Sequence, residues 1–339
     1  RGNGVADWVE RCLHPKTRIL KTDLTWVPLD SIKVGDNLIG IDEYHKPEKR
    51  RRLLRETKVT HIGNTYQLAY KIVLDNDIEI IASANHQWLK RGHHDDSKWT
   101  ATSLLKIGDA IKNCCDVWET DNSYEAGYVA GFLDGEGHAG MKKRNILGFV
   151  QSDNGLTEVV ASILDEKGYG FKTKETSIMG STHKRYKSLF IQNRREVWRL
   201  LGSVRPKRLL QKVVIDGKDT SAEHQEGAVG IKDIIQLEPM KLIDIETDCH
   251  TFVAEGLFTH NSNIVDSQRR RCNEIFRPLK EEGQLIAIGT GNHEEDIHRK
   301  YDDDIIRNLC RDMNVPYAGY QSFIVLRFIR AQKIMHLLT

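Results

Sequence analysis

The sequence carries a β-type pattern that stops near residue 122 and resumes after residue 227. In the first stretch, short runs of alternating apolar and polar residues are separated by Gly, Asp and Asn, which is typical of half-buried strands. The clearest runs are Thr17–Lys21, Asp36–Ile41, Tyr70–Leu74 and Ile78–Ala82. The same texture returns between Ile231 and Phe258. Because the stretch between them has a different pattern, the sequence predicts a β domain with a second domain inserted into it.

Two phrases within the β domain are nearly the same. They are Ile32–Asp36 (IKVGD) and Leu105–Asp109 (LKIGD), 73 residues apart. They indicate either an internal β repeat or one common turn used twice.

The inserted segment, residues 123–214, begins with a helical pattern. Tyr124, Tyr128 and Phe132 recur at a spacing of four, and residues 156–167 and 194–201 also favour helices, with basic strand-like stretches between them. The order of elements predicted for the insert is αββαββα.

The net charge of +2 conceals a local imbalance. Residues 126–214 contain 16 Lys and Arg against 8 Asp and Glu, so they carry +8 and the rest of the chain carries −6. Such an excess indicates either a surface that meets a polyanion or a solvated basic face.

Length and composition limit the class of protein. A chain of 339 residues is too long for one ordinary domain, and 39% hydrophobic residues with 7 prolines exclude wholesale disorder. No apolar stretch approaches the ~18 residues that cross a bilayer, and the first eleven residues lack the apolar core of a signal peptide. We therefore expect a cytoplasmic location and no membrane contact.

The six cysteines show no CxxC spacing, which argues against a zinc module or a disulfide framework. We expect Cys249 to pack rather than to act in redox chemistry. The cysteines expected to be structural are Cys114, Cys115, Cys272 and Cys310.

Reactive residues stand at both borders of the β domain, Cys12 at the start and His260-Asn261-Ser262 at the end. A thiol, an asparagine preceded by histidine, and a hydroxyl just beyond it are the groups that protein self-splicing requires. The thiol of Cys12 can attack the carbonyl of Arg11 and form a thioester. The hydroxyl of Ser262 can then accept the acyl group, and Asn261 can cyclise and release the segment as a succinimide.

Three segments resemble the sequence blocks of inteins: Cys12–Leu20 (CLHPKTRIL), Ser83–His86 (SANH) and His250–Ser262 (HTFVAEGLFTHNS). The resemblance implies a mainly β horseshoe of the hedgehog/intein type, the Hint domain. This domain would comprise residues 12–122 and 215–261 and would bring its two ends together. Splicing of this kind needs no cofactor.

The resemblance also implies roles at the first junction. His86 would hydrogen-bond the Arg11–Cys12 amide and protonate its leaving nitrogen. Ser83 stands where the family has threonine and keeps the hydroxyl. Asp244 would activate the nucleophiles.

At the second junction, the resemblance assigns His250 to assist the cyclisation of Asn261. His260 would polarise the Asn261 carbonyl.

Within the insert, Val129–Gly137 (VAGFLDGEG) resembles the motif of the LAGLIDADG homing endonucleases. Small residues such as Gly127 and Gly131 would let two such helices pack closely. The resemblance implies that Glu136 binds Mg²⁺ together with a scissile phosphate, and that Asp134 is a structural or capping carboxylate.

One motif supplies half of a site, so the resemblance implies a homodimer that cuts double-stranded DNA. Gln151 and Lys207 stand near positions of accessory polar groups. The basic residues expected to face DNA are Lys142, Lys143, Arg144, Lys172, Lys174, Lys184, Arg185 and Lys187. The alternative is an inactive relic that keeps the fold.

Outside the β domain, Gly291–Glu294 (GNHE) resembles a motif of calcineurin-like metallophosphoesterases. It follows an apolar run, residues 284–289, that we expect to form a buried strand. The resemblance implies that Asn292 binds a metal, that His293 donates a proton and that Asp7 is a bridging ligand after ligation. The other segments of that family are missing, so the flanks, residues 1–11 and 262–339, are interpreted as an inactive α/β fragment of a host protein.

The leading hypothesis is therefore an intein that excises residues 12–261 and joins Arg11 to Ser262, and that carries a homing endonuclease. The alternative is a metallophosphoesterase whose β insertion does not splice and serves as a binding module.

Overall fold

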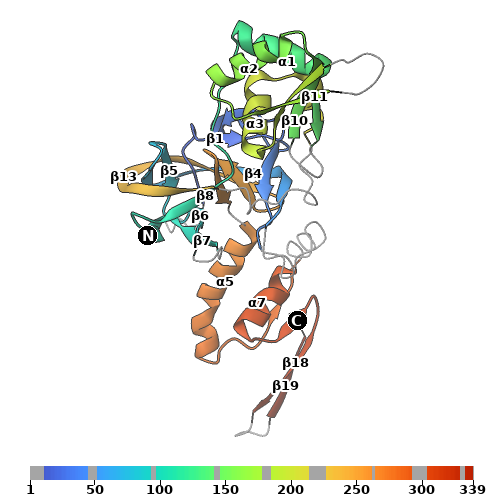
Figure 1. Cartoon of the computed structure of the whole chain (residues 1–339). Coiled ribbons are helices and arrows are strands. Elements are labelled where there is room, and N and C mark those ends of the chain that lie inside the picture. The colour runs from blue at the N-terminus through green and yellow to red at the C-terminus, as the bar shows by residue number, and fades with distance from the viewer. Residues whose placement is uncertain are drawn as a thin grey trace. The chain divides into compact units, whose positions relative to one another are not determined.

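The computed structural model describes residues 11–44, 52–92, 97–140, 146–177, 185–213, 227–261, 264–291, 304–328 and 333–338. The chain forms two compact units (Figure 1). One is Val9–Ser262, and the other includes Asn263–Thr339. No helix in the described ranges is both long enough and apolar enough to cross a membrane.

The first unit is built on an 11-stranded sheet, so its mainly β architecture is as predicted. The strand order is β2-β1-β14-β15-β6-β8-β13-β4-β3, with β5 paired to β4 and β7 paired to β6. The strands are β1 (Arg18–Leu20), β2 (Trp26–Pro28), β3 (Asn37–Ile41), β4 (Leu54–Leu74), β5 (Glu79–Ser83), β6 (Gln87–Lys90), β7 (Lys98–Ala101), β8 (Ala110–Asn113), β13 (Gly227–Thr247), β14 (Thr251–Ala254) and β15 (Leu257–His260). The four runs expected to be strands lie in β1, β3, β4 and β5.

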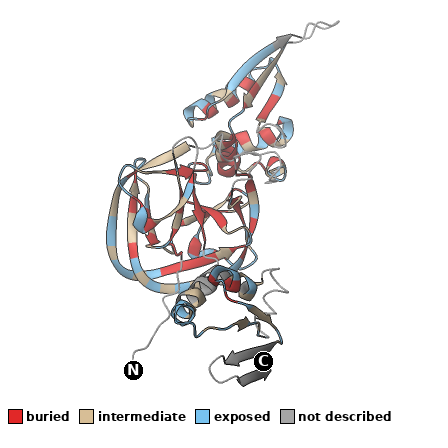
Figure 2. Ribbon diagram, turned by 90° about the horizontal axis from the view of Figure 1, so that it is seen from below, coloured by how far each residue is buried: buried red, intermediate tan, exposed pale blue. Residues whose placement is uncertain are grey.

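Two strands of 21 residues, β4 and β13, form the longest antiparallel ladder of the sheet. Their register runs from Leu74 opposite Ile231 to Val59 opposite Thr247, with irregularities at three points. The first and last strands also meet, because Ile19 of β1 pairs with Ala254 of β14. Figure 2 shows buried residues concentrated in the interior strands of this unit, where Trp88 and Phe252 are at most 1% exposed.

The repeated phrase forms the same turn twice. In residues 33–36 and 106–109, the lysine N–H donates to the aspartate side chain at 2.9 Å and the aspartate N–H donates to the lysine carbonyl at 3.0 Å. The glycine has a φ of 96° in the first turn and 87° in the second, a region that glycine adopts readily. A 3-10 helix precedes each turn (η1, Leu29–Ser31; η3, Thr102–Leu104). The first glycine N–H bonds to β4 and the second to β13, which favours an internal repeat.

The insert has the predicted element order αββαββα, followed by one short helix. Its four-stranded sheet has the order β11-β12-β10-β9. The elements are α1 (Tyr124–Glu136), β9 (His138–Gly140), β10 (Ile146–Ser152), α2 (Leu156–Glu166), β11 (Lys172–Ser177), β12 (Arg185–Ile191), α3 (Arg194–Val204) and α4 (Lys207–Leu210). The helices cover one face, where Leu147, Phe149, Leu189 and Ile191 are buried.

Helix α3 also joins the insert to the large sheet. The Arg195 guanidinium donates to the carbonyls of Cys114, at 3.2 Å, and Asn113, at 3.0 Å. On the same helix, Gly202 lies against the ring of Trp118, whose Nε1 donates to the Leu24 carbonyl at 3.2 Å. The two parts of the first unit therefore share a packed boundary.

The second unit contains α5 (Ile264–Glu281), β16 (Ile288–Gly289), α7 (Ile305–Met313), β17 (Tyr317–Gly319), β18 (Phe323–Phe328) and β19 (Lys333–Leu338). The prediction of a buried strand over residues 284–289 is wrong. Among the described residues, only Ile288–Gly289 pairs, with β17, and Ile286 is 49% exposed. Leu285 and Ile288 are partly buried against α7, so the run is not a buried strand.

Candidate active site

The two ends of the β domain meet at one place. Leu13 forms a two-bond bridge with Ile243 of β13, with N–H to carbonyl distances of 2.9 and 2.8 Å. Arg11, one residue before Cys12, reaches the other end, and its Nη1 donates to the carbonyl oxygen of Asn261 at 2.7 Å. Residues 250 positions apart are therefore in direct contact.

Side chains from the end of β5 and the turn after it hold the Arg11–Cys12 peptide. The N–H of Cys12 donates to the Ser83 hydroxyl oxygen at 3.0 Å, and the Nδ1 of His86 lies 2.8 Å from the carbonyl oxygen of Arg11. The peptide is thus contacted on both its nitrogen and its oxygen. His86 therefore hydrogen-bonds the Arg11–Cys12 amide, as predicted, through its carbonyl oxygen, while Ser83 contacts its nitrogen.

The imidazole of His86 is neutral. Burial, reinforced by electrostatic interactions with Arg11 and His260, lowers its pKa to about 3, although its bond to the Arg11 backbone works in the opposite direction. Since the carbonyl oxygen can only accept, Nδ1 carries the proton. The other ring nitrogen, Nε2, has no hydrogen-bond partner among the described residues. The ring therefore provides one N–H donor that points at the carbonyl oxygen of the Arg11–Cys12 peptide.

The thiol of Cys12 is fully buried. The Nε2 of Gln67 donates to its Sγ at 3.4 Å, and this contact would also stabilise a thiolate. Asp244 lies on β13 next to Ile243, so the Leu13 bridge places it opposite Cys12. The structure thus brings the predicted residue Asp244 to the first junction.

Asn261 is fully buried, and its side chain lies between Thr247 and His250. Its backbone N–H donates to the His250 carbonyl at 3.0 Å. The amide orientation that satisfies both of its ends places Oδ1 as acceptor of the Thr247 backbone N–H and Nδ2 as donor to the His250 carbonyl. Thr247 and His250 thus hold the side-chain amide in one orientation.

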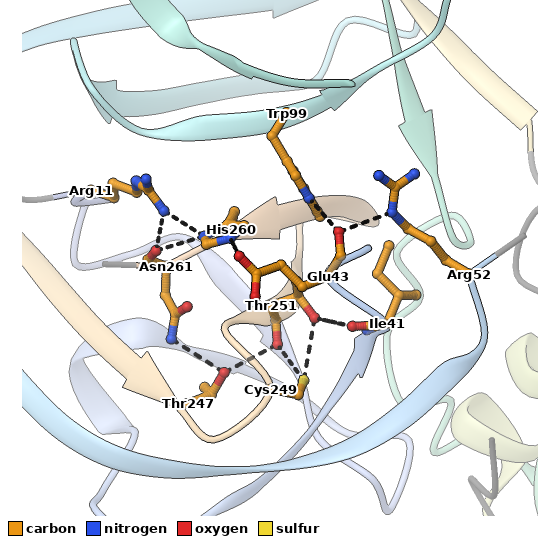
Figure 3. A network of polar contacts seen from close by, with 10 residues as sticks. All are labelled: Arg11, Ile41, Glu43, Arg52, Trp99, Thr247, Cys249, Thr251, His260 and Asn261. Carbon is orange, nitrogen blue, oxygen red and sulfur yellow. Dashed lines mark hydrogen bonds and ion pairs between the residues drawn. The ribbon is translucent and has the colours of Figure 1, made fainter. Parts of the chain in front are cut away.

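His260 connects the two junctions (Figure 3). Its Nε2 lies 2.7 Å from Oε1 of Glu43, and its Nδ1 lies 2.5 Å from Nη1 of Arg11 and 2.8 Å from the carbonyl oxygen of Asn261. The edge of its ring packs against Trp99, with centroids 5.1 Å apart. The Trp99 Nε1 also donates to the Glu43 carbonyl at 2.9 Å, so the indole orients both partners.

Glu43 is a carboxylate at neutral pH. Burial by itself would raise its pKa, but the hydrogen bond and electrostatic interaction with His260, with smaller contributions from Tyr44 and His250, outweigh burial and lower it.

His250 stacks on His260, with centroids 6.3 Å apart and an angle of 11° between the rings. Its backbone is left-handed, with a φ of 61°. Its Nδ1 is buried and has no hydrogen-bond partner in the part of the chain that the structure describes. The structure therefore brings His250, His260 and Asn261 together, and Ser262 lies outside the described residues.

Four contributions to this site were not predicted from the sequence: Glu43, Gln67, Thr247 and the side chain of Arg11. Glu43 follows a buried strand and lies 217 residues from His260, and no local pattern connects the two. For Arg11, the available signal was its position directly before Cys12, but nothing in the sequence assigns a role to its side chain.

In the insert, Asp134 is a capping residue, as predicted. Its carboxylate accepts the backbone N–H groups of Lys207 and Arg208, both at 2.8 Å, at the start of α4. Glu136 is exposed at the end of α1. Across the described ranges, no group of three or more His, Cys, Asp and Glu side chains is arranged to hold a metal ion.

The lysines of the insert lie on two sides of its sheet. Lys172 and Lys174 are exposed on the face opposite the helices. Lys187 alternates with Leu189 on the helix-covered side, and so does Arg185. The remaining predicted contacts, Lys142, Lys143, Arg144 and Lys184, lie outside the described residues.

The ammonium group of Lys187 is already paired. Its hydrogen bonds to Glu158 and Asp153 raise its pKa above the ordinary value. Gln151 lies opposite Lys187 in the ladder, on the same side. The open face of the sheet therefore includes neither of them.

All six cysteines are free thiols. Cys249 packs beside Thr251, with Sγ 3.3 Å from its hydroxyl oxygen, and burial raises the pKa of the Cys249 thiol. The flank residues Asp7, Asn292 and His293 lie outside the described residues.

Comparison with solved structures finds inteins and an intein-like domain. The chain is similar to a variant of the Ssp DnaB mini-intein, with 12% sequence identity, a TM-score of 0.38, and coverage of 75% of this chain and 99% of that one. It is similar to the DnaB intein from Synechocystis sp. PCC 6803, with 11% identity, a TM-score of 0.37, and coverage of 75% and 99%. It is also similar to a bacterial intein-like domain from Clostridium thermocellum, with 10% identity, a TM-score of 0.35, and coverage of 74% and 98%. No protein-family model and no curated protein matches the sequence.

Proposed function

We propose that residues 12–261 excise themselves by protein splicing and join Arg11 to Ser262. One observation carries the proposal: the carbonyl of Arg11 and the carbonyl of Asn261, which are the two that would react, are held in one network. His86 contacts the first at 2.8 Å, and Arg11 itself contacts the second at 2.7 Å. A purely structural sheet end has no need for donors aimed at both carbonyls.

In the first step, the sulfur of Cys12 attacks the carbonyl carbon of Arg11, and the bond from that carbon to the Cys12 nitrogen breaks. The thiol loses a proton and the leaving nitrogen gains one. The N–H of His86 stabilises the negative charge that develops on the Arg11 oxygen. The Ser83 hydroxyl lies 3.0 Å from the leaving nitrogen and orients the amide.

In the later steps, the Ser262 hydroxyl accepts the acyl group from Cys12 and forms a branched ester. The Asn261 side-chain nitrogen then attacks its own carbonyl carbon, and the bond to Ser262 breaks. The contacts of Asn261 with Thr247 and His250 limit the conformations of the side chain, which reduces the entropy that ring closure must remove. The released ester rearranges to the Arg11–Ser262 amide.

Mass spectrometry of freshly expressed protein tests the proposal. Splicing predicts a free 250-residue species and an 89-residue ligated product. Both products are lost when Cys12→Ala is combined with Asn261→Ala. A wild-type chain that stays wholly intact in reductant contradicts splicing and favours the alternative, a metallophosphoesterase with a non-splicing insertion.

We further propose that the insert binds double-stranded DNA as a homodimer and cuts it. The supporting observations are the αββαββα order, an open sheet face with Lys172 and Lys174, and an exposed α1 face at Gly127 and Gly131, where an added Cβ would meet no atom within 4 Å. Each chain has one LAGLIDADG-like motif and therefore a single Glu136. A second copy would have to supply the other carboxylate of a metal site.

Cleavage of DNA that carries the uninterrupted host gene, with Mg²⁺ present, tests the endonuclease. Glu136→Gln is expected to abolish cutting and to leave splicing unchanged. DNA affinity is expected to fall steeply with salt, because phosphate neutralisation releases counterions. Binding without cutting by the wild-type protein would support the relic.

A further inference from the structure

The side chain of Arg11 contacts the reacting group of the opposite junction. Its Nη1 lies 2.7 Å from the carbonyl oxygen of Asn261 and 2.5 Å from Nδ1 of His260. Arg11 is only 7% exposed, so these contacts are shielded from water and their electrostatic strength is large. Figure 3 shows the guanidinium, the imidazole and the carbonyl meeting at one point.

The contact with Arg11 determines which nitrogen of His260 carries the proton. A guanidinium has five N–H donors and no acceptor, so Nδ1 must accept and cannot carry a proton. The proton then resides on Nε2, which donates to the Glu43 carboxylate at 2.7 Å. In this state His260 cannot donate to Asn261, although its Nδ1 lies 2.8 Å from the carbonyl oxygen. The donor to that oxygen is Arg11.

We propose that Arg11, while its bond to residue 12 is intact, is a catalytic residue for the cleavage of the Asn261–Ser262 bond. Its guanidinium stabilises the negative charge on the Asn261 oxygen as the side-chain nitrogen attacks, and Glu43 and His260 act as positioning residues that hold it there. The inference rests on the proposed splicing reaction. It adds that the residue before the first junction, which belongs to the host, supplies part of the chemistry at the second.

The step balances without any further reactant. A bond forms between the Asn261 side-chain nitrogen and the main-chain carbonyl carbon, and the bond from that carbon to the Ser262 nitrogen breaks. The side-chain nitrogen loses one proton and the Ser262 nitrogen gains one. Arg11 keeps its charge throughout and acts only on the oxygen.

The test uses the full chain with Cys12→Ala, which blocks the first step and leaves Arg11 attached. Release of residues 262–339 is followed by mass spectrometry for Arg11, Arg11→Lys and Arg11→Ala. We expect Arg11→Ala to slow the release at least about tenfold. Arg11→Lys keeps the positive charge but not the planar guanidinium, and its release rate is expected to lie between those of the other two chains. Arg91→Ala removes an exposed arginine of the same unit and is expected to change nothing. An equal or faster rate for Arg11→Ala overturns the inference.

A second measurement does not depend on cleavage. In the unreactive Cys12→Ala, Asn261→Ala chain, ¹⁵N chemical shifts of His260 are expected to show a protonated Nε2 and an unprotonated Nδ1. A protonated Nδ1 overturns the inference. If no chain releases residues 262–339, including the one with Arg11 intact, the proposed splicing fails at its second junction. The ¹⁵N chemical shifts of His260 would still show whether Arg11 donates to its Nδ1.

Discussion

The Ser83 hydroxyl accepts a hydrogen bond from the N–H of Cys12 at 3.0 Å, while the Ser83 N–H donates to the Cys12 carbonyl at 2.9 Å. One residue thus contacts the main chain of Cys12 at both its N–H and its carbonyl. We expect Ser83→Ala to slow thioester formation about tenfold, because the amide loses its side-chain contact while the backbone bond remains. Ser83→Thr keeps the hydroxyl and is expected to retain most of the rate. The measurement is cleavage by a thiol in the Asn261→Ala chain; equal rates for Ser83→Ala and wild type would show that the hydroxyl has no role.

Glu43 fixes the proton of His260, so its loss should affect the second junction. In the Cys12→Ala chain, Glu43→Ala is expected to slow the release of residues 262–339 about tenfold. Glu43→Gln keeps an acceptor without charge and is expected to slow it less. Glu56→Ala, on the exposed side of β4, is the matched control. An unchanged rate for Glu43→Ala would leave the Glu43–His260 bond without a catalytic purpose.

The neutral state of His86 makes stability depend on pH. The unfolded imidazole takes up a proton near pH 6.5, whereas the folded one stays neutral until about pH 3, so the unfolded state binds one more proton between these values. The stabilising contribution is therefore complete above pH 6.5 and is lost as the pH falls. In the unreactive Cys12→Ala, Asn261→Ala background, we expect the free energy of unfolding to fall more steeply than for His86→Gln, by about 1 kcal/mol per pH unit. Denaturant titrations between pH 6.5 and pH 4 measure this, and parallel slopes would contradict it.

Gly40 lies where β3 passes close to β14. A Cβ at this position would clash with the Thr251 carbonyl, with its hydroxyl oxygen at 2.8 Å and with the Cys249 sulfur at 3.0 Å. Backbone cannot yield as a long side chain does, so Gly40→Ala is expected to lower the free energy of unfolding by about 1–3 kcal/mol. Gly63→Ala, on β4, meets no atom nearer than 3.9 Å and is the control. Thermal unfolding of both variants in the unreactive background tests this, and equal stabilities would show that the close approach is not tight.

The sequence is informative where a pattern is local. Period-two runs predicted β1, β3 and β5, and the recurrence of Tyr124, Tyr128 and Phe132 predicted α1, because strand and helix periodicity are properties of neighbouring residues. The 21-residue lengths of β4 and β13 could not be predicted, since irregularities in the ladder interrupt their alternation.

Some residues of the candidate site could be predicted from the sequence, and others could not. Cys12, His260 and Asn261 stand at the ends of a recognisable order, so the sequence points to them. Glu43 could not be predicted as a site residue, because nothing near it in the sequence distinguishes it from a solvent-exposed acidic residue. The pairing of Lys187 with Glu158 and Asp153 likewise depends on the fold, because the three residues are not neighbours in the sequence.

The pairing of β1 with β14 sets a schedule for biosynthesis. Ile19 pairs with Ala254, so β1 cannot complete its pairing until a strand made 235 residues later has been translated. At 5–20 residues per second the ribosome needs roughly ten to fifty seconds to supply it. Under the proposed splicing reaction, a nascent chain that stalls or is truncated in this interval would keep the Arg11–Cys12 bond intact. The order of the strands would then make the joining of Arg11 to Ser262 depend on completed translation of residues 12–261.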